Sequence, residues 1–144
     1  LLHQLPVFIH IVNDIEKVSD KALNLIELAE LVFEKKVTFT EQAHQEIDDL
    51  HALVIQMHRI TLAAFAENDH LKARQALQLE QQINRAQERL RKANSKRLEN
   101  HTCQVYSGLI YIDVVNNLEK IGDHLANIAI ATIRDFTLSD EYEE

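Results

Sequence analysis

Two stretches near opposite ends of the chain carry the same polar pattern. NDIEKVSDKALN spans residues 13–24, NNLEKIGDHLAN spans residues 116–127, and both fit N-x-[IL]-E-K-[VI]-x-D-x-x-x-N. On a helix, residues four positions apart lie on one face, so each stretch would present two carboxylates side by side. Carboxylate oxygens are hard ligands that suit iron, manganese, magnesium or zinc. The pattern therefore predicts cation binding by two pairs, Glu16 with Asp20 and Glu119 with Asp123.

The repetition is what supports the metal hypothesis. A single acidic pair is commonplace in a chain with 23 Asp and Glu residues. A repeat kept only for packing would retain its apolar positions, whereas these two copies share mainly Asn, Glu, Lys and Asp. We therefore expect polar neighbours in the copies to act as weaker ligands or to orient the carboxylates. These neighbours are Asn13, Asn116 and His124.

The composition indicates that long helices position these residues. The 144 residues include two Gly, one Pro and 46% hydrophobic residues, so turns must be few, which disfavours a sandwich or barrel. Apolar residues recur at helical spacing and are interrupted near EKKVTFTEQ, near ENDH and after Asn100. Thr38 or Thr40 would cap the second helix, and Asn68 or Asp69 the third. We predict helices at about residues 5–35, 40–66, 69–98 and 104–136.

Short turns between long helices make successive helices antiparallel, so the expected fold is one all-α domain, an antiparallel four-helix bundle. The stripe expected to face the core from the first helix is Ile9, Val12, Ile15, Val18, Leu23, Ile26 and Leu31. The corresponding stripe of the third helix is Leu71, Leu77, Ile83 and Leu90.

Folding the chain at these turns brings polar residues to one level. Glu80 and Asn84 fall level with the second carboxylate pair, and His58 falls level with the first. One hypothesis is a single acidic layer in which Asn84 and His58 assist five carboxylates. The other is that the pairs point outward on separate helices, each holding its own ion or none. The five carboxylates are Glu16, Asp20, Glu80, Glu119 and Asp123.

These motifs resemble those of one known family. EKIGDH with its flanking Asn residues, residues 49–73 with IQM and AFA, and LEQQINRAQERL at 79–90 are similar to the PhoU family of phosphate uptake regulators. The resemblance implies tandem three-helix repeats, with an acidic motif on the last helix of each repeat and multinuclear iron or zinc clusters. It places Glu80 and Asn84 in the acidic positions of another helix. The chain resembles one motif helix followed by one complete three-helix repeat. Its donor types alone also leave manganese, nickel, magnesium and calcium open.

The resemblance also implies a function. The shortened form is similar to the cytoplasmic PhoU-like domain of bacterial Na/Pi cotransporters. That similarity implies a metal-binding regulatory domain of phosphate uptake at the inner face of the cell membrane. Its partner would be a phosphate transporter or its own membrane domain. Because the chain starts without Met, we expect a C-terminal fragment of a longer membrane protein. A free-standing PhoU-like regulator is the alternative.

Charge and missing motifs narrow the function further. The net charge of −8 disfavours nucleic acid as a partner, and the single Cys103 permits no internal disulfide and favours a reducing compartment. The chain lacks HExxH, a P-loop, a nucleophile elbow and paired Glu-x-x-His motifs, so we predict neither an enzyme nor a small-molecule substrate. Two alternatives are a di-metal carboxylate enzyme and a metal-free helical interaction module. In the module, the apolar start LPVFIHIV would pack on absent helices or on a second copy, giving a homo-oligomer.

Overall fold

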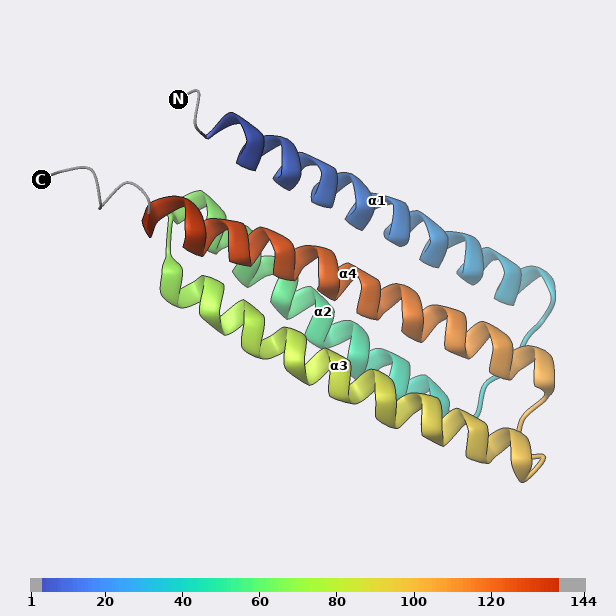
Figure 1. The fold of residues 1–144 in the computed structure, drawn as a ribbon. Coiled ribbons are helices and arrows are strands. Elements are labelled where there is room, and N and C mark those ends of the chain that lie inside the picture. The colour runs from blue at the N-terminus through green and yellow to red at the C-terminus, as the bar shows by residue number, and fades with distance from the viewer. Residues whose placement is uncertain (1–3, 138–144) are drawn as a thin grey trace, which may run out of the picture.

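The computed structural model describes residues 4–137, with side chains through Arg134, and in this range the chain forms four α-helices without any strand (Figure 1). They are α1 (Leu5–Glu34), α2 (Glu41–Glu67), α3 (His70–Glu99) and α4 (Val105–Thr137). The helix bounds differ from the sequence prediction by about one residue. Successive helices run antiparallel, which confirms the all-α antiparallel fold class.

α4 is the central element of the fold. It packs against each of the other three helices, and α2 and α3 also pack against each other. The backbone of α1 approaches α4 and neither α2 nor α3, although the ring of Phe8 on α1 meets the ring of Phe65 on α2 edge to face, with centroids 6.3 Å apart. Figure 1 shows α1 lying along the outer side of α4. The molecule is therefore a three-helix bundle, α2 to α4, with one further helix against it.

The core lies between α2, α3 and α4, where one apolar stripe of each helix turns inward. Seven of its large side chains are at most 2% exposed: Leu50, Met57, Ile83, Leu90, Val115, Leu118 and Leu125. Leu71 was expected among them and is 69% exposed. The buried Ala73, Ala76 and Ile83 set the core-facing phase of α3, and Leu71 falls about 120° away from that phase.

α1 buries a different face from the predicted one. Ile9, Val12, Leu23 and Ile26 are 53–62% exposed, whereas Ile11 is 3% exposed. The face that meets α4 runs through Val7, Ile11, Asp14, Val18 and Leu25. α1 is apolar on both faces, and helical periodicity alone does not say which of two apolar faces is covered. Despite this apolar character, no helix in the described part of the chain meets the length and hydropathy needed to cross a membrane.

Capping residues explain where the helices begin. The hydroxyl oxygen of Thr40 accepts a hydrogen bond from the Ala43 backbone N–H at 3.1 Å, so Thr40 rather than Thr38 caps α2. The Asp69 carboxylate caps α3 by accepting from the Leu71 backbone N–H at 2.9 Å. Asn68 adopts a left-handed conformation (φ 54°) that ends α2.

A polar cluster ties together the other ends of the bundle helices. The Tyr111 hydroxyl of α4 donates to the Glu46 carboxylate of α2 at 2.6 Å. The Arg97 guanidinium of α3 lies 3.0 Å from the same Glu46 oxygen and 4.8 Å from the centre of the Tyr111 ring. Burial and the hydrogen bond to Glu46 raise the pKa of Tyr111 well above its usual range, so the phenol keeps its proton. The cluster holds the relative heights of α2, α3 and α4.

Candidate metal centre

The second carboxylate pair lies between α4 and α3. Because three helices surround α4, even its polar residues are partly covered, and Glu119 is 9% exposed. Burial, the hydrogen bond and charge of Asp123, and the charge of Glu80 raise the pKa of Glu119 to about 7. Lys120 opposes this shift, with its ammonium 3.0 Å from Asp123 and 3.8 Å from Glu119. The Lys120 side chain is 54% exposed, so water screens much of its charge.

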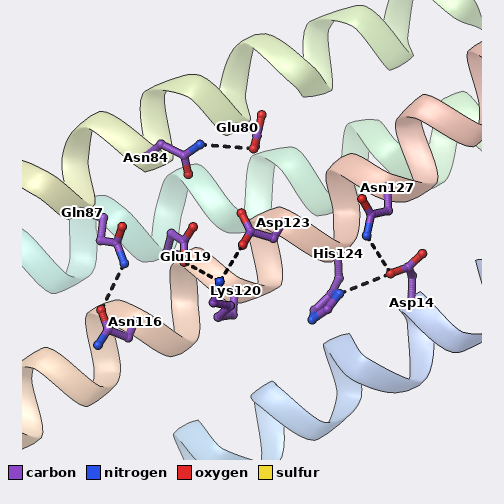
Figure 2. Close-up of polar contacts among 10 residues, drawn as sticks. All are labelled: Asp14, Glu80, Asn84, Gln87, Asn116, Glu119, Lys120, Asp123, His124 and Asn127. Atoms are coloured by element: carbon purple, nitrogen blue, oxygen red, sulfur yellow. Dashed lines mark hydrogen bonds and ion pairs between the residues drawn. The ribbon is translucent and has the colours of Figure 1, made fainter.

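α3 contributes two oxygen-bearing side chains to the same region. Figure 2 shows Glu80 and Asn84 on α3 across from Glu119 and Asp123 on α4. The Asn84 amide N–H donates to the Glu80 carboxylate at 3.2 Å. The amide oxygen of Asn84 is buried and accepts no hydrogen bond, and leaving such an acceptor unpaired costs free energy. One turn away, the Gln87 amide donates to the Asn116 amide oxygen at 3.1 Å.

The donor atoms in this region are of the types that bind a cation, but they are not assembled into a complete binding site. Glu119 is a buried carboxylate next to two others, and Asn84 offers an unpaired hard oxygen. A cation would satisfy both, because it attracts carboxylates and accepts electron density from an amide oxygen. Yet in the part of the chain that the structure describes, no three His, Cys, Asp or Glu side chains are close enough to form a metal-binding group. To coordinate an ion, the side chains would have to move closer together; they are Glu80, Asn84, Glu119 and Asp123.

The first carboxylate pair is not part of this region. Glu16, Asp20 and Asn13 are exposed on α1, and no hydrogen bond or ion pair joins them to the α3–α4 residues within the described range. The backbones of α1 and α2 stay apart, and within the described range Glu16 and Asp20 do not form a metal-binding group with His58 as predicted. His58 is half-buried on α2 without a polar contact in that range. The structure thus matches neither hypothesis in full, because the α1 pair points outward whereas Glu119 of the α4 pair is buried.

Asp14 is a polar contact that sequence reasoning missed. Its carboxylate lies 3.2 Å from the His124 ring nitrogen and accepts a hydrogen bond from the Asn127 amide at 3.1 Å, as Figure 2 shows. His124 therefore faces α1 and does not support the carboxylates facing α3. The helical spacing of α1 could have indicated this contact, because Asp14 lies on the same face as Ile11 and Val18, the face that meets α4.

Comparison with known proteins identifies the family of the α2–α4 bundle. A family model described as PhoU domain matches residues 47–132, more than half of the chain, from α2 to α4. The matched range includes Glu80, Asn84, Glu119 and Asp123 and excludes α1. No solved structure matches the chain.

A curated relative extends the similarity toward the N-terminus. It is the phosphate-specific transport system accessory protein PhoU homolog 1 of Thermotoga maritima, 25% identical over 131 residues. The alignment covers 89% of this chain and 56% of the relative, so the chain spans about half the length of the curated protein it matches.

Proposed function

Because this chain belongs to the PhoU domain family, we propose that it is a metal-binding regulatory domain of phosphate uptake and not an enzyme. The family match and the similarity to the Thermotoga maritima relative, which is named as an accessory protein of a phosphate-specific transport system, support the link to phosphate. The partner would be a phosphate transport protein at the inner face of the cell membrane. A membrane domain of the same chain, as in a Na/Pi cotransporter, is our preferred form, and a free-standing regulator is the second.

The observation that carries metal binding is the buried carboxylate of Glu119. The charges of Glu80 and Asp123 act on it, and Asn84, whose amide oxygen is buried and unpaired, lies across from it on α3 (Figure 2). Among the described residues, the cation that acts on Glu119 is the exposed Lys120. Without a cation, ionised Glu119 destabilises the contact between α3 and α4. Glu80, Asn84, Glu119 and Asp123 would hold the ion. The bound ion would be iron or zinc, and the same donor types also suit manganese, nickel, magnesium or calcium. When bound, it supplies positive charge, which an acidic surface needs before it can bind phosphate.

The surroundings of these carboxylates favour regulation over catalysis. A hydrolytic or oxidative metal site needs a proton-transfer group beside the reacting atom. In the described range neither Glu119 nor Asp123 contacts a histidine, and His124 is engaged by Asp14 on the α1 side of α4. What remains is a set of oxygen donors shared by two helices. Such a set can change how firmly α3 packs on α4.

Metal content measured on matched variants tests this proposal. The purified chain is incubated with each metal in turn, desalted and measured by elemental analysis. Glu119→Gln with Asp123→Asn should lose bound metal, whereas Asp113→Asn, an exposed carboxylate of the same helix, should not. Glu16→Gln with Asp20→Asn separates the two pairs. Metal that survives the α4 changes and disappears with the α1 changes would move the site to α1. A chain that binds no metal would be the helical interaction module.

The regulatory role needs a cellular measurement. Uptake of radiolabelled phosphate is followed in bacteria that carry the native gene with Glu119→Gln and Asp123→Asn, with Asp113→Asn as the control. We expect the double change to alter the response of uptake to external phosphate while Asp113→Asn leaves it unchanged. An identical response in all strains would contradict a role for this site in phosphate uptake.

A further inference from the structure

α3 carries a row of positive charges along its outer face. At about 100° per residue these side chains fall within roughly 60° of one another, on the side of α3 that points away from the buried Ile83 and Leu90. At a rise of about 1.5 Å per residue, the row is roughly 33 Å long. All five residues are exposed, and we call them the α3 basic stripe: Arg74, Arg85, Arg89, Lys92 and Lys96.

The stripe is not neutralised within the protein. In the described part of the chain its five residues form no ion pair and no hydrogen bond. Glu88 stands four residues before Lys92, where a helical ion pair could form, yet the two are not paired. Arg85 and Arg89 are also four residues apart, and like charges at this spacing destabilise a helix. The stripe therefore lowers the stability of α3 and stabilises no contact of the fold.

The stripe is an exception in an acidic molecule. Its five residues carry a charge of +5 in a chain of net charge −8, so the remaining residues together carry −13. The stripe also lies away from the exposed apolar face of α1. α1 packs on the other side of α4 and its backbone does not approach α3 (Figure 1). A segment that covered α1 would therefore leave the outer face of α3 open.

We propose that the α3 basic stripe docks the protein on an anionic lipid surface, the inner leaflet of the cell membrane. A flat membrane meets a straight helix along a line, so all five cations can come within the Debye length of roughly 8–10 Å. The acidic residues of α1 lie beyond α4, at least one helix diameter of about 10 Å farther from that surface, where salt screens them. The location at the inner leaflet rests on the proposed function.

The composition of this face favours lipid over other anionic partners. Between Arg74 and Lys96, glutamines occupy the remaining positions of the face, and it offers no apolar centre of the kind found in protein interfaces. α3 contains no Phe, Tyr or Trp on which the bases of a single strand could stack. Leu71 lies on the same side one turn before Arg74 and is 69% exposed, so it can enter the interfacial layer of a membrane.

Flotation of the purified chain with lipid vesicles tests the docking. The vesicles contain phosphatidylcholine alone, or phosphatidylcholine with about one third phosphatidylglycerol, which is anionic. A chelator is present, so that no metal bridges a carboxylate to a lipid phosphate. At about 0.1 M salt the chain should float with the anionic vesicles and not with the neutral ones. At about 1 M salt, where the Debye length is roughly 3 Å, the binding should disappear.

Variants at exposed positions locate the docking surface. Each Lys or Arg near an anionic surface strengthens binding by roughly fivefold, so Arg85→Gln with Lys92→Gln should weaken binding at least tenfold. Lys17→Gln with Lys35→Gln removes the same charge from exposed positions on α1 and should leave binding within twofold. Circular dichroism should show equal helix content in both variants, which separates weaker docking from unfolding.

Several outcomes would overturn the proposal. The stripe is not a lipid surface if the chain ignores anionic vesicles, if it floats equally with neutral ones, or if both double variants weaken binding alike. Fluorescence anisotropy with a labelled oligonucleotide and a labelled poly-glutamate peptide covers the other anionic partners. Binding of either one that is tighter than binding to vesicles and is lost in the Arg85→Gln and Lys92→Gln variant would assign the stripe to nucleic acid or to an acidic protein.

The docking and the proposed function fail separately. Metal content of the Arg85→Gln and Lys92→Gln variant should equal that of the native chain, because neither side chain is a proposed ligand. Loss of flotation with normal metal content therefore concerns the stripe alone. If the chain floats with anionic vesicles but the Glu119→Gln and Asp123→Asn changes leave phosphate uptake unaltered, the docking stands and the proposed function falls.

Discussion

Replacing Glu119 by Gln should stabilise the metal-free protein in a pH-dependent way. Gln keeps the size and hydrogen-bonding capacity of the side chain but cannot ionise. In the folded chain, burial and the neighbouring Asp123 raise the pKa of Glu119 from 4.5 to about 7. A carboxyl with a raised folded-state pKa contributes stability that is fully present below pH 4.5 and is lost as the pH rises through 7. The Gln variant lacks this loss.

The size of the effect follows from the shift. One pKa unit corresponds to about 1.4 kcal/mol, so ionising Glu119 in the folded state costs up to about 3 kcal/mol. The side chain keeps 11% of its surface exposed, so solvent screening reduces the expected difference to roughly 2 kcal/mol at pH 8.5. In a chain of this length that difference raises the melting temperature by about 4–8 °C. At pH 4.5 both proteins carry a largely neutral side chain and should have nearly equal stability.

Urea denaturation with a chelator present, at pH 4.5, 6, 7 and 8.5, measures the difference directly. Groups that do not interact with residue 119 titrate alike in both proteins and cancel, so the pH trend reports the side chain at position 119 together with the carboxylates that interact with it. Asp113→Asn serves as the control and should show no such trend. Adding the metal that the native chain binds should stabilise that chain and leave the Gln variant unchanged. Parallel pH profiles of native and Gln proteins would refute the buried-carboxylate reasoning, whatever the metal result.

Three further substitutions test other contacts of the fold. Tyr111→Phe removes the hydroxyl that donates to Glu46. Because a carboxylate loses a partly buried donor, the free energy of unfolding in urea should fall by about 1–3 kcal/mol. No loss of stability would mean that water satisfies the cluster. Thr40→Ala removes the cap of α2 and should cost about 1 kcal/mol, measured in the same way. Asp14→Ala frees His124 and should accelerate amide hydrogen exchange in α1 more than in the bundle, since α1 packs mainly on α4; uniform exchange would contradict that arrangement.

The parts of the site that the sequence predicted are those set by local rules. Thr40 and Asp69 cap α2 and α3, so the helix bounds could be read from N-cap preferences and apolar spacing. The turn between α3 and α4 is short, which fixes the register of these two helices. Glu80 and Glu119 were therefore placed near each other correctly.

The parts that failed depend on how helices distant in sequence share a surface. α1 carries apolar residues on two faces, Ile11 on one and Val12 on the other, and composition gives neither face priority. The predicted stripe named mainly the exposed face, and the prediction assigned no contact to Asp14, which lies on the face that meets α4. A closed four-helix arrangement would have covered both faces. Among the described residues the backbone of α1 approaches that of α4 only, so Val12 and its neighbours stay exposed, and tertiary packing decided what periodicity could not.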